Sequence, residues 1–330
     1  MRTTRRLATL GVLAALLVMA VVASLAVGSR AVPPAEVWRA LTAPDGGETA
    51  TIVRSLRLPR TVLGLLVGSG LALAGVLMQA LTRNPIAEPR VLGVGAGAAL
   101  GVVVAIAVFG VGTAAGYVWF AIGGAVLAGG AVLAAGQRGD RSPVTLALAG
   151  AALDAALGSV VVGILAVSGR TFDEYRFWLV GALTGRDLDV AVQLAPFVLA
   201  GAAVAALLPR PLDALALGDD VAVGLGHRVG LVKLAAGTTA VVLTGAAVAA
   251  AGPVAFVGLA VPHVARALVG VAHRWLLPAS ALLGPVLLLG ADVAGRVVTP
   301  PAEISAGIVT ALVGAPVLAY VVVRGRAVAR

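Results

Sequence analysis

The sequence predicts an all-α integral membrane protein with about ten transmembrane helices, folded as a single domain over residues 1–330. Sixty per cent of its residues are hydrophobic and only 12% are charged, whereas a soluble domain usually carries about 25% charged residues. Apolar runs of about 20 residues recur along the chain, and this is the length that crosses a bilayer as a helix. The chain has too little polar surface for a soluble globule of its size.

The first apolar run, near 7–27, follows Arg2, Arg5 and Arg6. A signal peptide has an apolar core of about 7–15 residues. This run is longer, and further apolar runs follow it, so we expect a retained spanning helix. The next segment, 28–56, is polar, and a short surface helix is expected near 37–41.

Nine further spans are expected. They lie near 61–82, 91–109, 114–136, 144–167, 191–208, 230–250, 253–270, 276–297 and 304–323. Pro253 and Pro262 interrupt the eighth span of the chain, which is therefore either a full span or partly re-entrant. Glycine stripes in 61–82 and 91–109 predict close packing of helix backbones.

The charge distribution indicates how the chain lies in the membrane. The net charge is +9, and the basic residues cluster at the ends of apolar runs. With both termini in the cytoplasm, most of them fall in cytoplasmic segments, as membrane orientation requires. A lipid bilayer is thus the expected surrounding, and no nucleic-acid partner is expected. Cysteine is absent from the sequence, which excludes thiolate metal sites, and we expect no metal site.

The sequence contains no GxxxxGK[ST] phosphate loop, so we expect no ATPase activity and no catalytic residues in this chain. The segment 213–226, between two spans, has the spacing of one or two short amphipathic helices that end at glycines. Such a segment is either a plain connecting loop or a surface on which a partner docks.

Five motifs occur in order along the chain. They are RLPR at 57–60, GxxLAxxGxxxQxxxRNPxAEPxxLGxxxGA at 68–98, LALGxxxAxxLG at 215–226, GPxxFxGLxxPHxAR at 252–266 and PAExxxGIxTAxxGAP at 301–316. Together they resemble the FecCD-type permeases of binding-protein-dependent ABC importers for iron-siderophores, haem or cobalamin. The resemblance runs from about residue 30 to 324.

This resemblance implies the type II ABC importer permease fold in the cytoplasmic membrane. It implies a second permease subunit, identical or paralogous, two ATP-binding subunits and a substrate-binding lipoprotein. No cofactor is expected on this chain, because ATP and Mg²⁺ bind the partner ATPase. The expected cargo is a metal chelate, with an iron-siderophore placed before haem and cobalamin.

The resemblance also implies roles for individual residues. The docking residues for the binding protein are Arg57, Arg60 and Arg296; interfacial anchoring is the alternative for the first two. The cytoplasmic gate residues are Asn84, Pro85, Ile86, Ser142 and Pro143, for which an ordinary helix-breaking turn is the alternative. The residues that couple to the ATPase are Leu217, Gly218, Asp219, Ala222, Leu225 and Gly226.

Four other polar residues lie in or near spans. A carboxylate at mid-bilayer costs about 2.5–3.5 kcal/mol, so Asp154 and Asp292 should face protein or water. Asp292 is four residues from Arg296, which predicts a structural pair. Asp154 either lines a pathway or makes a local hydrogen bond. His263 is expected to be structural, and Arg266 either structural or part of the pathway. An ion-coupled secondary carrier with the two acids as relay groups is the alternative function.

Overall fold

The computed structural model describes residues 3–43, 46–138, 143–299 and 302–316, and no strand occurs among them. Its α-helices are α1 (Thr3–Ala26), α2 (Pro34–Thr42), α3 (Glu48–Thr51), α4 (Leu58–Thr82), α5 (Val94–Ala107), α6 (Ala114–Arg138), α7 (Pro143–Val167), α8 (Gly169–Leu179), α9 (Leu188–Leu207), α10 (Pro209–Ala216), α11 (Asp219–Gly224), α12 (Val229–Ala251), α13 (Val257–Val269) and α14 (His273–Val298). A π-helical turn, η1 (Ile52–Arg57), joins α3 to α4, and a 3-10 turn, η2 (Pro89–Leu92), precedes α5. A further apolar helix covers Ala306–Pro316.

Seven of the described helices are long and apolar enough to cross a membrane: α1, the continuous helix of α3, η1 and α4, then α6, α7, α9, α12 and α14. They coincide with seven of the predicted spans. The other three positions hold shorter apolar helices, namely α5 with 14 residues, α13 with 13, and Ala306–Pro316. Residues 317–323 of the last predicted span lie outside the described residues. All ten predicted positions thus hold a helix among their described residues, and α5 and α13 are shorter than predicted.

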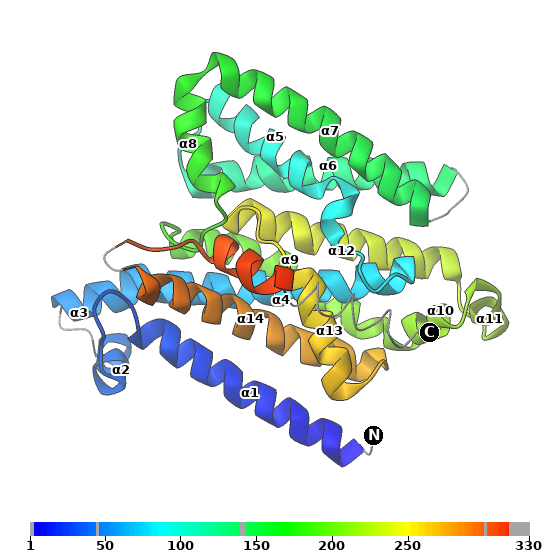
Figure 1. The fold of residues 1–330 in the computed structure, drawn as a ribbon, viewed down its shortest axis with the longest axis horizontal. Helices are drawn as coiled ribbons and strands as arrows, with labels where there is room; N and C mark the ends of the chain where they lie inside the picture. Colours follow the sequence, from blue (N-terminus) through cyan, green and yellow to red (C-terminus); the bar gives the residue numbers. More distant parts are fainter. Residues whose placement is uncertain (1–2, 44–45, 139–142, 300–301, 317–330) are drawn as a thin grey trace.

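The helices run roughly side by side, so that the molecule has two ends (Figure 1). We call them the α2 end, which holds α2 and α3, and the α11 end, which holds α10, α11 and the start of α1. Helix α4 lies in the middle and packs on α9, α12, α13 and α14. Helices α5 to α8 form a lobe at one edge, which packs on the rest of the bundle mainly through α6 and α12, and α1 lies at the opposite edge.

The predicted small-residue stripes are where helix backbones meet. A Cβ atom on Gly68 would collide with the backbone of Gly284 and Pro285 in α14, and one on Gly75 would collide with the carbonyl of Gly258 in α13. In the lobe, Gly97 of α5 faces the backbone of α6 at the same close range. Lipid gives no hydrophobic drive for helix association, so close backbone packing holds these helices together.

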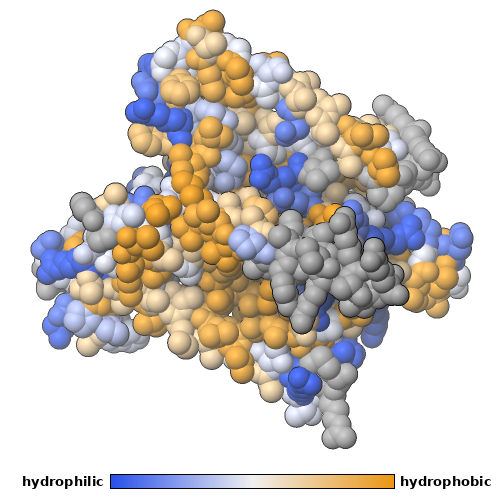
Figure 2. Space-filling model, in the orientation of Figure 1, coloured by the Kyte–Doolittle hydropathy of each residue, from blue (hydrophilic) through white to orange (hydrophobic). Residues whose placement is uncertain are grey.

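The surface is arranged as a membrane requires. In Figure 2 hydrophobic residues cover much of the middle of the visible face, while hydrophilic residues gather toward the two ends. A hydrophilic patch interrupts this pattern in the middle of the face, where the lobe meets the rest of the bundle. A polar patch at this depth needs water or protein beside it, because lipid cannot satisfy its hydrogen bonds.

Candidate functional site

Arg57 closes the end of the first helix. Its buried guanidinium donates hydrogen bonds to the carbonyl oxygens of Leu25 and Ala26, both at 2.8 Å, and to that of Arg30. The last carbonyls of a helix have no partner within the helix, and cationic side chains near its C-terminus satisfy them. Arg57 is thus a cap for α1, and its side chain does not project from the surface.

Arg60 and Arg296 enclose the carboxylate of Asp292. Arg60 Nε lies 2.8 and 2.9 Å from its two oxygens, Arg296 Nε donates to it at 3.1 Å, and Asp292 is fully buried. The pair predicted between Asp292 and Arg296 is therefore present. On its other side Arg60 contacts Glu303, with 2.6 Å between Nη1 and Oε2. The cluster joins α4, α14 and the segment after α14.

A cavity of about 350 Å³ opens beside this cluster at the α2 end. Its charged lining residues are Arg30, Arg57, Arg60, Arg186, Arg296, Asp187 and Glu303. Partial burial opposes ionisation of Glu303, but the hydrogen bond and charge of Arg60 outweigh it and hold the pKa of that carboxyl below its usual value. Arginines outnumber acids even so, and the cavity suits a carboxylate or another anion.

The turn predicted as a gate lies at the α11 end. Arg83 has a left-handed backbone with φ of 50°, and α4 ends there. The Ile86 N–H then donates to the Asn84 side-chain oxygen at 3.0 Å. This turn, with Pro85 inside it, makes a rigid exposed corner.

Asp219 connects this corner to the predicted coupling segment. Its Oδ1 lies 3.3 Å from Arg83 Nη2, and its Oδ2 lies 2.5 Å from Lys233 Nζ. Gly218 precedes α11 with φ of 113°, a conformation that side chains rarely adopt. Through Asp219 the corner after α4, the start of α11 and the first turn of α12 form one connected unit.

Around this unit, apolar side chains point outward. Leu217 and Leu225 are 67% and 61% exposed, and Val223 is 61% exposed, whereas Ala222 is buried. Gly226 ends the segment with a positive φ of 83°. The segment 217–226 is therefore a compact helical protrusion with an apolar outer face, which is typical of a surface that meets another protein.

Arg266 joins α13 to α4, whereas His263 bonds within α13. Arg266 Nη2 donates to Gln79 Oε1 of α4 at 2.6 Å, and the Gln79 amide lies 3.4 Å from the Gly258 carbonyl. His263 Nδ1 lies 2.8 Å from the Leu259 carbonyl in its own helix. These contacts are structural.

A second polar cavity, of about 650 Å³, lies among α5, α7 and α8 and reaches Pro253 before α13. Its charged lining residues are Glu88, Arg90 and Asp154. Residues of α5 and α7, many of them glycine or alanine, form most of its wall, and the aromatic residues Tyr175 and Trp178 of α8 line it as well. Asp154 therefore lies on the wall of an open cavity that two other charged side chains also line.

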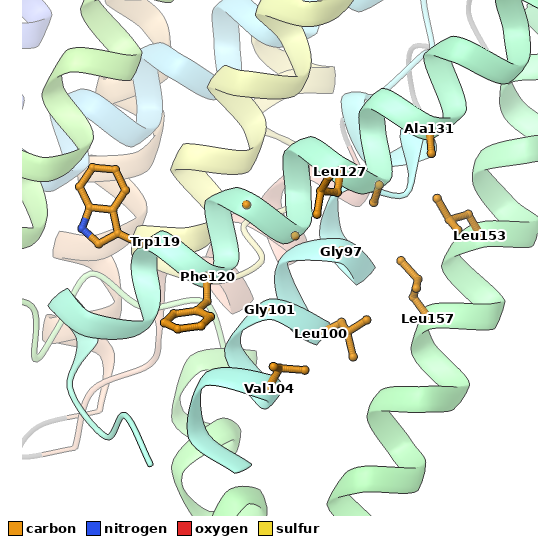
Figure 3. A pocket seen from close by; sticks show the side chains of 13 residues that line it. Gly97, Leu100, Gly101, Val104, Trp119, Phe120, Leu127, Ala131, Leu153 and Leu157 are labelled. Carbon is orange, nitrogen blue, oxygen red and sulfur yellow. The ribbon is translucent and has the colours of Figure 1, made fainter. Parts of the chain in front are cut away.

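An apolar groove of about 670 Å³ lies on another face of α5 (Figure 3). Leu153 and Leu157 of α7 face Leu100 of α5 across it, and Trp119 stands at one end. None of the described residues that line it is charged. Such a surface suits lipid tails and offers a polar ligand no bonds, so the polar cavity is the better candidate site.

The sequence singled out Asp154 but missed its charged neighbours. Glu88 and Arg90 flank Pro89, just after the predicted gate. Two charged residues directly before an apolar run could have indicated that they belong to the same site as Asp154. Of the other predicted gate residues, Ser142 lies outside the described residues and Pro143 is the first residue of α7.

Comparisons with known proteins agree along the whole chain. The ferric enterobactin transport system permease protein FepD of Escherichia coli is 44% identical over 97% of this chain and 96% of its own length. The probable siderophore transport system permease protein YfiZ of Bacillus subtilis is 38% identical over 94% of both chains. The cobalamin import system permease protein BtuC of Halobacterium salinarum is 42% identical over 83% of this chain and 74% of its own.

A solved inward-facing structure of a metal-chelate type ABC transporter has the same fold. Its TM-score is 0.82 at 30% sequence identity, over 96% of this chain and 98% of that one. The model of the FecCD transport family matches residues 16–324. The helix positions, the ordered motifs and these matches agree, and the chain belongs to the FecCD transport family.

Proposed function

We propose that this chain is the permease subunit of an ABC importer that carries an iron(III)-siderophore across the cytoplasmic membrane, driven by ATP that separate subunits hydrolyse. The relatives named for ferric enterobactin and siderophore transport support this cargo. Such permeases work in pairs, so a second copy or a paralogue completes the path.

The orientation follows from the charges at the two ends. The α11 end carries Arg83, Arg228, Lys233 and Arg274 together with the start of α1, and positively charged segments stay on the cytoplasmic side. We therefore place the α11 end in the cytoplasm and the α2 end outside.

The observation that carries the proposal is the protrusion of segment 217–226. Its outer face is apolar and exposed, and its first acid, Asp219, contacts Arg83 beside the gate turn. A carrier that works alone needs no such surface. A subunit driven by an ATPase needs one, together with a direct link from that surface to the gate.

The arginine-rich cavity at the α2 end is the counterpart site for the substrate-binding protein. An acidic side chain of that protein would enter the cavity and meet its surplus positive charge. Fixed charges of this kind steer a partner and set its register more than they add affinity. Arg57, Arg60 and Arg296 would then act from inside the cavity.

Reconstitution of the permease in liposomes tests the proposal. With the ATPase and the loaded binding protein present, uptake of a ⁵⁵Fe-labelled siderophore should require ATP and stop with vanadate. Cyanocobalamin and haem are the competing cargoes, and transport of either in place of the siderophore would change the assignment. Uptake by the permease alone, abolished by an ionophore, would instead establish an ion-coupled carrier.

A matched pair of variants tests the coupling surface. Leu225→Glu places a charge on the exposed apolar face and should abolish stimulation of the ATPase by the loaded binding protein. Val271→Glu places the same charge at an exposed site outside the segment and should leave stimulation intact. Equal effects of the two variants would remove segment 217–226 from the coupling role.

A second pair tests docking without damage to the buried cluster. Arg30 lines the cavity with its side chain 55% exposed, while Arg39 lies exposed on α2 outside it. Arg30→Glu should weaken binding-protein affinity in nanodiscs, and Arg39→Glu should do so less. If both variants bind like the wild type, the cavity is not the docking site.

A further inference from the structure

Asp154 is a carboxylate at membrane depth that is not buried in the protein's core. It lies near the middle of α7, which has 25 residues, and its side chain is exposed. A charge at this depth costs about 2.5–3.5 kcal/mol if it faces lipid. Helix α7 packs on α5 and α6, and Asp154 lines an open cavity beside α5 and α8, so its carboxylate must meet water or a second subunit.

No local partner explains this acid. Among the described residues, no hydrogen bond or ion pair reaches the Asp154 carboxylate, whereas Asp292 has two arginines. The local hydrogen bond that the sequence left open is therefore not made within the described chain. Instead Asp154 lines the 650 Å³ cavity together with Glu88 and Arg90.

Two of the three charged residues on this cavity wall are acids. Burial raises the pKa of the Glu88 carboxyl, while the charge of Arg90 and a hydrogen bond from the Phe256 backbone act in the opposite direction. Asp154 is the more exposed of the two acids and has no bonding partner among the described residues. Two permease subunits would bring two such walls together.

We propose that Asp154 sets the charge selectivity of the path. Its unpaired carboxylate favours chelates that carry cationic or hydrogen-bond-donating groups and disfavours polyanionic chelates. The inference rests on the proposed function, in which this cavity is part of the route for the cargo. It adds a selective group inside the permease to the selection made by the binding protein.

The absence of cysteine from the chain permits a direct test. Ala151→Cys places one thiol in the cavity, one helical turn from Asp154, and Gly158→Cys does so on the other side. In the complex with its ATPase in nanodiscs, each thiol is reacted with a cationic and an anionic methanethiosulfonate reagent. The measured quantity is the ratio of the two rates, which reports the local electrostatic potential and needs no cargo.

We expect the cationic reagent to react faster, and Asp154→Asn to lower the rate ratio about tenfold, as Coulomb's law gives for a unit charge about 6 Å away in water. Arg90→Gln should raise the ratio. Val271→Cys, exposed and outside the cavity, is the control, and its ratio should not respond to Asp154→Asn.

An unchanged ratio at both cavity positions would overturn the proposal. So would thiols that react with neither reagent, because the cavity would then not be open to water. Failure of the proposed function would look different: ATP-independent uptake in liposomes could coexist with a ratio that depends on Asp154.

Discussion

Two acids in spanning helices show how differently the two halves of this molecule use charge. Asp292 in α14 is fully buried and held by Arg60 and Arg296, in the half where α4 packs on its neighbours. Asp154 in α7 is exposed on the wall of a cavity, in the lobe where most of α7 is uncovered. Aspartate thus stabilises the fold at position 292, where two arginines bind it, and is left without a bonding partner in the described chain at position 154.

The largest effect is expected from Asp292→Asn. The substitution keeps the shape of the side chain but leaves the buried Arg296 without a charge partner and Arg60 with Glu303 alone, which costs about 3–5 kcal/mol. Denaturant unfolding in detergent micelles measures this loss. If Asp292→Asn unfolds at the wild-type denaturant concentration, the cluster does not stabilise the fold.

The second expectation concerns glycines in the same two halves. Gly75→Ala in α4 forces a methyl group against the Gly258 carbonyl and should cost about 1–3 kcal/mol of unfolding free energy. Gly158→Ala in α7 meets no atom within 4 Å and should cost nothing measurable. Equal losses in the two variants would mean that the halves are packed alike.

A smaller effect is expected from Glu303→Gln, because this acid is partly open to solvent. We expect a loss of about 1 kcal/mol or less. Since the pKa of Glu303 is lowered in the folded protein, its contribution is present above the unfolded pKa of about 4.3 and disappears as the pH falls through the folded pKa. Unfolding curves of wild type and variant should therefore converge in acid, and a constant gap would argue against the pair with Arg60.

The smallest effect on stability is expected from Asp154→Asn. Its carboxylate makes no bond within the described chain, so the unfolding free energy should stay within about 0.5 kcal/mol of the wild type. The chemical change is the same as in Asp292→Asn, which makes the two variants a matched pair. A loss of several kcal/mol here would show that Asp154 also has a structural partner.

The span positions could be predicted from the sequence because each depends on a local apolar run. The pair of Asp292 and Arg296 was visible for the same reason, since four residues along a helix bring side chains together. The predicted surface helix near 37–41 is present as α2, and segment 213–226, expected to hold one or two short helices, contains the end of α10 and all of α11.

The long-range partners of the arginines could not be predicted from the sequence. Arg60 meets Glu303 across 243 positions, and Arg57 caps a helix that ends about 30 positions earlier. Nothing in either local pattern specifies these contacts, so the arginines looked available to a partner. Helix α8 was also missed, because it is too short and polar for a span. Its Ser168 cap, which accepts from the Thr171 N–H at 3.3 Å, was its one local signal.

Arg57, Arg60 and Arg296, which were expected from the sequence to dock the binding protein, are buried and stabilise the fold. An Arg60→Glu change would place three acids together around one buried site, so reduced partner binding in such a variant would report misfolding. Exposed members of the cavity wall, such as Arg30, separate the two effects.

The cap on α1 has a consequence for how the protein is made. The final carbonyls of this helix are satisfied by Arg57 and by Arg296, which lies 272 positions after Ser24. At ribosomal speeds of about 5–20 residues per second, the second arginine emerges on the order of tens of seconds after the helix itself. During synthesis the C-terminal carbonyls of α1 therefore lack the bond from Arg296 until α14 has been made. For that time, water, a chaperone or the insertion machinery must take the place of this arginine.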